Sequence, residues 1–214
     1  MQRGFLTICV IILGMGAKLG FAQNPLPSST KLPIVASVFN NGTLLPGGGE
    51  LGVFSIPVHP GVSIGTEFRY KSHQQNEWFQ TAKLAYHYHH YVQHSIQLYS
   101  ELGYRRHFKN PLDVGARGGL GYLHSIPDAQ VFELDSEGTY QSKNSIGRAQ
   151  LMTGLSLELG YALSEEGTLP TRVFVAYQFY LQMPFVQKYV PLMPNTALHV
   201  GVSFPLWTIK TASR

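Results

Sequence analysis

Four histidines are crowded into one short stretch of the chain: His87, His89, His90 and His94. Imidazole is a common ligand of zinc and copper, and alternate residues of an extended strand point to the same face. His87 and His89 have this spacing, so they are the candidate metal ligands. The alternative is that these histidines only line a polar, interfacial rim. Neither a cysteine nor an acidic residue on the same strand adds to the metal set.

A second group of residues could support hydrolysis. His124 and Ser125 are followed by Glu133 and Asp135, and a hydroxyl nucleophile needs a base within hydrogen-bond reach and an acid that orients the base. Adjacent residues on a strand point to opposite faces, so His124 and Ser125 meet only if the backbone turns there. We therefore assign no catalytic residues and expect no cofactor, and the sequence favours a non-enzymatic role.

The elements that must position these residues are β-strands. From Ile96 to Leu123, apolar residues keep to even positions and polar residues or glycines to most odd ones, apart from a short turn at 107–111. A period of two sustained this long indicates extended strands. Similar segments predict eight strands in all: 50–58, 62–70, 78–88, the two strands of the 96–123 hairpin, 149–161, 172–181 and 197–206.

Charged residues within these strands lie on the face opposite the aliphatic side chains. On the lipid side of a membrane barrel each would cost about 2–4 kcal/mol at the midplane, whereas opposite charges can pair in a narrow lumen. The pattern predicts an all-β fold, an eight-stranded antiparallel up-and-down transmembrane β-barrel. Its expected lumen charge network comprises Glu67, Arg69, Lys83, Glu101, Arg105, Asp113, Arg117, Glu158 and Arg172.

Composition agrees with this prediction and limits the domain organisation. Charged residues make up 13% of the 214 residues, mean hydropathy is −0.03, and no apolar run past residue 23 is long enough for a spanning helix. We expect a signal peptide at 1–22, an irregular N-terminal periplasmic segment at 23–49, the barrel at 50–207 and a C-terminal tail at 208–214. Cys9, the single cysteine, lies in the signal. Beyond the signal the chain has 14 basic and 12 acidic residues, and this excess of basic residues is too small to indicate nucleic-acid binding.

The connection between residues 182 and 195 is unusually apolar for an exposed loop. Apolar surface of this density commonly meets another surface. The segment could fold over the barrel mouth, contact a partner protein or contact outer-leaflet lipid. Its candidate binding residues are Phe185, Tyr189, Leu192 and Met193.

The signal, the amphipathic strands and the aromatic-ended last strand resemble the small OmpA/OmpX-type outer-membrane barrels of Gram-negative bacteria. The resemblance covers 50–206, is architectural and includes no diagnostic motif. It implies export to the bacterial outer membrane and a surrounding of outer-membrane lipid. The chain departs from the pattern by continuing through Trp207–Arg214.

Several interpretations of function stay open at this stage. The sequence favours a structural or interaction protein that works through its extracellular loops. The alternatives are a lipid-modifying barrel similar to the deacylases, a metal-binding barrel and a narrow gated pore. The deacylase motif places its serine two residues after the histidine, which His124 and Ser125 do not match. A soluble lipocalin-type barrel would instead point its apolar residues inward, and the predicted aromatic girdles at both rims favour the membrane barrel.

Overall fold

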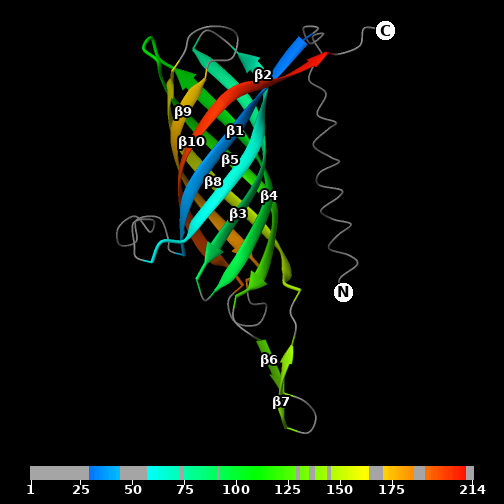
Figure 1. The fold of residues 1–214 in the computed structure, drawn as a ribbon. Helices are drawn as coiled ribbons and strands as arrows, with labels where there is room; N and C mark the ends of the chain where they lie inside the picture. The colour runs from blue at the N-terminus through cyan, green and yellow to red at the C-terminus, as the bar shows by residue number, and fades with distance from the viewer. Residues whose placement is uncertain are drawn as a thin grey trace. The chain divides into compact units, whose positions relative to one another are not determined.

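Eight strands close into an antiparallel up-and-down barrel (Figure 1). The computed structural model describes residues 29–43, 57–72, 75–90, 92–128, 131–134, 138–143, 146–163, 171–185 and 191–210. The barrel strands are β1 Ser29–Gly42, β2 Pro60–Ser72, β3 Asn76–His89, β4 Gln93–His107, β5 Leu112–Pro127, β8 Arg148–Ala162, β9 Arg172–Met183 and β10 Met193–Lys210. The expected fold class is confirmed.

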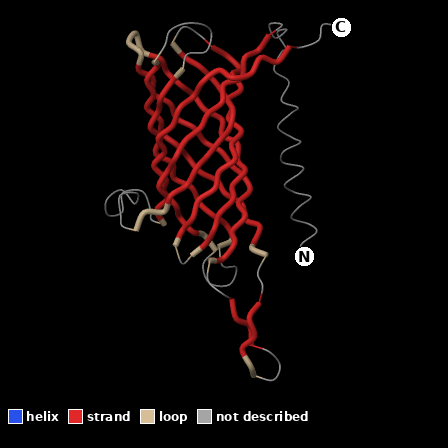
Figure 2. Tube along the Cα trace, in the orientation of Figure 1, coloured by secondary structure: helices blue, strands red, loops and turns tan. Residues whose placement is uncertain are grey.

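Two further strands lie in the chain between β5 and β8. β6, Val131–Leu134, and β7, Tyr140–Lys143, pair antiparallel in a separate two-stranded sheet. The trace in Figure 2 is strand and loop throughout its described part. None of the described segments forms a helix long and apolar enough to cross a membrane.

The two ends of the barrel carry connections of different length. At one end, here called the turn end, residues 73–75, 108–111 and 163–171 join successive strands. At the other, the loop end, the connections are 43–59, 90–92, 128–147 and 184–192. This asymmetry is typical of outer-membrane barrels, in which short turns face the periplasm and longer loops face outside.

The first barrel strand is not where the sequence predicted it. β1 spans Ser29–Gly42, inside the segment that was expected to be irregular. Of the expected strand at 50–58, residues 50–56 lie outside the described residues, and 57–58 are not in a strand. The apolar patch at 33–39 left a short strand or a plug of the barrel mouth as alternatives, but a full barrel strand was not predicted there, because Val35 and Phe39 are buried in the bore while Val38 is exposed. Apolar residues on both faces remove the alternation that signals a strand. The other seven predicted strands lie within β2–β5 and β8–β10.

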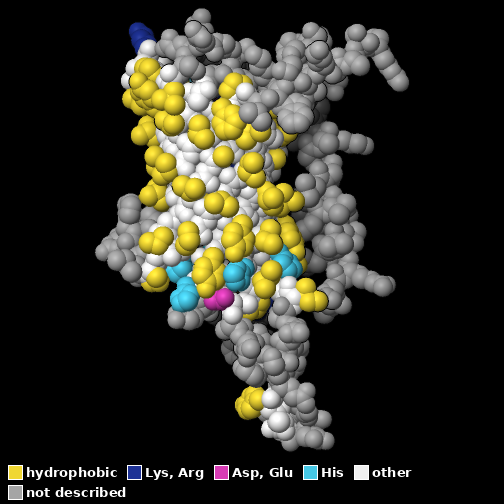
Figure 3. Space-filling model, in the orientation of Figure 1, with side chains coloured by type: hydrophobic (Ala, Val, Ile, Leu, Met, Phe, Trp, Pro, Cys, Tyr) yellow, Lys and Arg dark blue, Asp and Glu magenta, His cyan; other side chains and the backbone are white. Residues whose placement is uncertain are grey.

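The outer wall of the barrel is apolar. Leu98, Leu157 and Val62 are 56%, 65% and 55% exposed, although each belongs to a regular strand. In Figure 3, hydrophobic side chains are spread over the visible face of the wall. Exposed tyrosine and tryptophan lie near both ends of the strands: Tyr70, Trp78 and Tyr161 toward the turn end, and Tyr86 and Tyr122 toward the loop end.

Glycines on the inner face make room for large side chains in the narrow bore. Gly121 is paired with Tyr99 of the neighbouring strand. A Cβ atom at Gly121 would lie 2.3 Å from the Tyr99 Cβ, closer than real carbon atoms approach. Glycine at this position therefore lets Tyr99 be buried inside the barrel.

Candidate functional site

The side chains that face the bore change in character from the loop end to the turn end. Strand β4 presents Gln93 and Gln97 near the loop end, then Tyr99, and then Glu101 and Arg105 toward the turn end. All five are 5% exposed or less. The bore thus holds an amide layer and an ionic layer, with apolar and aromatic side chains such as Tyr99, Leu123 and Met152 packed together between the amides and the ion pairs.

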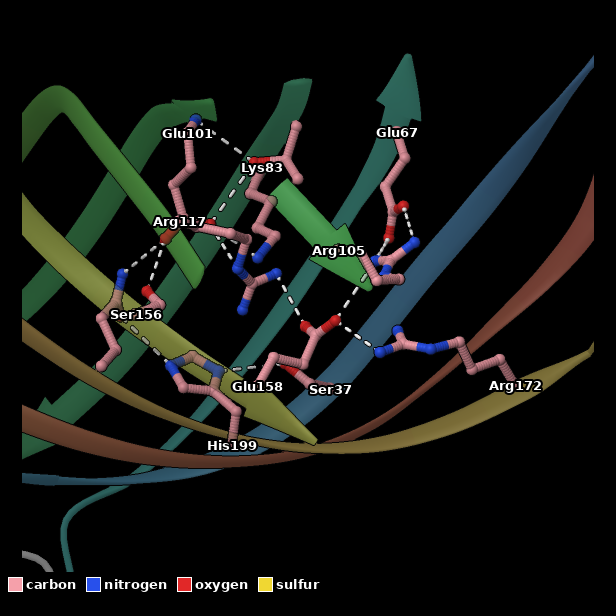
Figure 4. Close-up of polar contacts among 12 residues, drawn as sticks. Ser37, Glu67, Lys83, Glu101, Arg105, Arg117, Ser156, Glu158, Arg172 and His199 are labelled. Atoms are coloured by element: carbon pink, nitrogen blue, oxygen red, sulfur yellow. Dashed lines mark hydrogen bonds and ion pairs between the residues drawn. The ribbon is translucent and has the colours of Figure 1, made fainter. Parts of the chain in front are cut away.

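Arg105 is the centre of the ionic layer (Figure 4). Its two terminal nitrogens donate to the two oxygens of Glu67, each at 3.0 Å, and Nη2 also donates to Glu158 at 3.2 Å. Arg172 bridges Glu158 at 2.6 Å and Asp113 at 2.5 Å. Bidentate arginine–carboxylate pairs of this kind are strong and geometrically specific.

A second group of charges lies beside the first. The Lys83 ammonium donates to Glu101 at 2.9 Å, and the Ser156 hydroxyl donates to the other Glu101 oxygen at 2.7 Å. Arg117 joins the two groups, with Glu158 at 2.9 Å and Glu101 at 3.7 Å. Because each buried charge has an opposite partner, the desolvation cost of the layer is offset by pairing.

Eight of the nine charges predicted for the lumen are buried in the bore, and Arg69 is 29% exposed beside Glu77 at the turn end. Glu77 was not among the predicted lumen charges, because strand three was expected to begin at Trp78. Glu77 is 1% exposed, forms an ion pair with Arg69 at 2.6 Å and contacts His107 at 2.9 Å. Its odd position in the strand pattern is the signal that could have identified it.

The amide layer was also not predicted. Its hydrogen bonds link Gln93 to Gln182 at 3.1 Å, Gln182 to Gln150 at 2.6 Å and Asn41 to Asn195 at 3.3 Å. These five side chains are 2% exposed or less. Four of the five lie outside the predicted strands, and Gln150 lies on the polar face of the predicted strand at 149–161, but only the closure of the barrel shows that these amides bond to one another.

The apolar connection is shorter than the sequence suggested, because β9 continues to Met183 and β10 begins at Met193. Met193 is 6% exposed and lies within the bore, whereas Leu192 is 49% exposed. The backbone carbonyl of Phe185 accepts a hydrogen bond from Arg148 at 3.1 Å, and that of Pro184 accepts one from Gln150 at 2.7 Å. These bonds hold residues 184–185 at the barrel mouth.

Tyr189, the remaining candidate of that connection, lies outside the described residues.

The two candidate metal ligands have different surroundings. His87 is fully buried in the bore, where Nδ1 bonds Gln97 at 3.3 Å and Nε2 has no hydrogen-bond partner. His89 stacks on His59 with ring centroids 3.6 Å apart. Partial burial, and then the neighbouring His89, lower the pKa of His59. No three His, Cys, Asp or Glu side chains in the described part of the chain are grouped to hold a metal, and the His87–His89 site stays a prediction.

His124 and Ser125 point to opposite faces. The Ser125 hydroxyl is buried in the bore and donates to Gln93, whereas His124 is on the outer wall, bonded to Tyr122 and to the carbonyl of Ile146. The two side chains therefore make no nucleophile–base pair. Of the candidate acids, Asp135 and the side chain of Glu133 lie outside the described residues.

Fold and interior together define a class of protein: a closed eight-stranded barrel with an apolar wall and a bore filled by paired polar side chains. The fold is similar to that of Neisserial surface protein A, which matches with a TM-score of 0.50 and 10% identity over 84% of this chain and 100% of that one. The chain thus shares the fold of small outer-membrane barrels of the OmpA/OmpX type.

Other solved structures match with lower TM-scores. The outer-membrane enzyme PagL has a TM-score of 0.46 at 12% identity, over 81% of this chain and 99% of that one. Ail, the attachment invasion locus protein of Yersinia pestis, has a TM-score of 0.39 at 10% identity, over 84% of this chain and 100% of that one. No known protein family and no curated protein matches the sequence.

Proposed function

We propose that this chain is a non-conducting barrel of the bacterial outer membrane, a structural or interaction protein that presents its loop end to the outside of the cell. The observation that carries the proposal is the continuous filling of the bore. Arg105, Glu158 and Arg117 are 1–5% exposed and are joined to one another by ion pairs. Eight strands leave an interior only wide enough for side chains, and here those side chains are bonded to one another.

The character of the wall supports placement in a membrane. Leu84, Leu98 and Leu102 are each at least 50% exposed at the middle of β3 and β4, and Leu155, Leu157 and Leu159 repeat this on β8. A contiguous apolar surface of this extent is unfavourable in water and favourable in hydrocarbon. Backbone hydrogen bonds are closed around the barrel, as a chain in lipid requires.

The loop end supports the proposed interaction role. Its connections include the longest ones between barrel strands, and one of them holds the β6–β7 sheet. Phe185, Tyr189 and Leu192 are the residues of the 184–192 connection that we propose contact a partner protein or outer-leaflet lipid.

Conductance of the reconstituted protein tests the closed bore. We expect no regular current steps across a planar bilayer, and a shift in gel mobility between unboiled and boiled samples that shows a closed barrel. Regular steps from a sample with this heat-dependent shift would contradict the proposal in favour of a pore. A water-soluble protein without the shift would contradict membrane placement.

Orientation is tested separately in intact cells. A protease recognition sequence inserted at 186–190 should be cut by added protease, whereas the same sequence inserted at 164–170 should be cut only after the outer membrane is opened. Cleavage at 164–170 alone in intact cells would reverse the proposed orientation. Loss of mobility shift in either variant identifies misfolding, so the heat test accompanies both.

A further inference from the structure

Histidine and tyrosine side chains are paired on the outer wall near the loop end. In each pair the tyrosine oxygen lies 2.8–2.9 Å from the imidazole Nδ1. In Figure 3, histidine side chains lie along the lower end of the barrel, below the hydrophobic wall. The pairs are Tyr86–His94, Tyr88–His90 and Tyr122–His124, on or beside β3, β4 and β5.

The second nitrogen of His124 decides which atom donates within its pair. Nε2 lies 2.9 Å from the carbonyl oxygen of Ile146. A carbonyl only accepts, so Nε2 carries the hydrogen, and Nδ1 of the neutral ring must accept from the Tyr122 hydroxyl. The neutral pair therefore directs its phenolic hydrogen inward, toward the histidine.

The same reasoning applies to His94 but not to His90. His94 Nε2 lies 3.4 Å from a carboxylate oxygen of Asp128, so Nδ1 of the neutral ring accepts from Tyr86. The Tyr88 hydroxyl instead donates to Asp128 at 3.0 Å, which leaves its oxygen to accept from His90 Nδ1. Two of the three pairs thus hold their phenolic hydrogen against a histidine.

Protonation reverses the hydrogen bond in those two pairs. Imidazolium carries hydrogen on both nitrogens, so Nδ1 must then donate to the tyrosine oxygen. The phenolic O–H is released to donate to an external acceptor, and a positive charge appears beside it. An anionic oxygen gains most from this change, because charge-assisted hydrogen bonds are the stronger ones.

The surroundings of the two pairs differ in charge. In the sheet register His124 is flanked by Ile96 on β4 and Ala149 on β8, neither of which is charged. Among the described residues no carboxylate lies within ion-pair distance of His124. His94 is flanked by Tyr88 on β3 and Ile126 on β5, and it faces Asp128. The Tyr122–His124 pair is therefore the one whose charge is available to a ligand.

The position of this pair indicates where such a ligand comes from. Tyr122 is paired with Leu98, which is paired with Leu84 across the wall, and both leucines are at least 50% exposed. His124 is paired with Ile96, two residues nearer the loop end, and contacts the Tyr122 hydroxyl. A lipid whose chains cover Leu84 and Leu98 would therefore place its headgroup beside His124 and the hydroxyl of Tyr122.

We propose that the Tyr122–His124 pair is an acid-activated binding site for the phosphate group of anionic lipids in the surrounding leaflet. This inference rests on the membrane placement proposed above. The phosphate oxygen accepts from the released Tyr122 hydroxyl and lies beside the imidazolium of His124. Tyr86–His94, held by Asp128, is a neighbouring pair whose charge is already balanced.

Lipid retention in nanodiscs tests the site. The full-length protein would be placed in phosphatidylcholine alone, or in phosphatidylcholine with phosphatidic acid or with oleate, and bound lipids counted by native mass spectrometry. On going from about pH 8 to about pH 5.5, we expect retention of phosphatidic acid to rise about tenfold. His124→Gln and Tyr122→Phe should each abolish most of this rise.

Tyr104→Phe is the matched control, because its hydroxyl, on the outer wall toward the turn end, bonds Asn76 rather than a histidine. It should keep the full rise. Equal retention by wild type and His124→Gln at both pH values would overturn the inference, as would an equal rise with oleate. Occupation of the pair by inorganic phosphate alone, at about 10 mM, would contradict a lipid source.

Failure of this site is distinguishable from failure of the membrane proposal. A protein that enters phosphatidylcholine nanodiscs as a heat-modifiable barrel but shows no phosphatidic acid preference refutes the site alone. A protein that does not enter these nanodiscs refutes the membrane placement on which the site rests.

Discussion

Arg105 and Glu67 form a bidentate ion pair inside the barrel, with both N–O distances at 3.0 Å and neither residue more than 2% exposed. Glu158 contacts the same guanidinium, and the ring of Phe79 lies 4.2 Å from it. One arginine thus neutralises carboxylates from β2 and β8 while itself belonging to β4. Strands that are distant in sequence are connected by a single side chain.

Arg105→Met should destabilise the barrel strongly. The change leaves Glu67 and Glu158 buried without this partner, and breaking a buried pair in this way costs about 3–5 kcal/mol. The measurement is the midpoint of urea unfolding in lipid vesicles, and the gel-mobility shift reports the folded fraction. Arg106→Met is the matched control, because Arg106 is the next residue in β4 and its side chain is exposed rather than buried in the bore. Adding Glu67→Gln to Arg105→Met should restore part of the loss; no restoration would mean that the pair is not the cause.

Gly121→Ala should overpack the bore. The new Cβ would lie 2.3 Å from the Cβ of Tyr99, and overpacking of this kind costs about 1–3 kcal/mol. Gly115→Ala is the comparison, because its nearest atom is 3.5 Å away. Both variants are compared by their unfolding midpoints. Equal midpoints would show that Tyr99 moves aside at no cost.

Leu98→Arg should prevent or weaken membrane assembly. Leu98 is 56% exposed on the outer wall, and an arginine facing lipid near the midplane costs about 2–4 kcal/mol. Ile146→Arg should cost little, since Ile146 is 89% exposed and precedes β8 in the connection at the loop end. Folding yield into vesicles measures the difference. Equal yields for the two variants would be incompatible with a lipid-facing wall.

Acidification should weaken the contact between His59 and His89. The pKa of His59 is lowered in the folded protein by partial burial and by His89, so the unfolded chain takes up this proton first as pH falls. The contribution of His59 to stability is therefore complete above its unfolded pKa of about 6.5 and declines below it. Unfolding free energy measured between about pH 8 and about pH 5 should fall less steeply for His59→Gln than for wild type. Identical slopes would contradict this prediction.

The limits of the sequence-based predictions follow from how strands signal themselves. Alternation is readable where one face is apolar and the other polar, as in β3, β4 and β9, and there the inward charges were assigned to the correct face. β1 buries Val35 and Phe39 and exposes Val38, so neither face is distinct. Gln93 and Gln182 lie outside the predicted strands, and Gln150, on the polar face of the predicted strand at 149–161, carries no charge that would predict a partner.

Sequence alone determined on which side of the wall each residue of seven strands lies, because side-chain direction along a strand depends only on local geometry. The tertiary structure decided which of these residues meet. Arg172 reaches Asp113 and Glu158, and Tyr122 is paired with His124 beside the carbonyl of Ile146, through the closure and stagger of the barrel. Stagger sets the height of each strand against its neighbours, and no single strand contains that information.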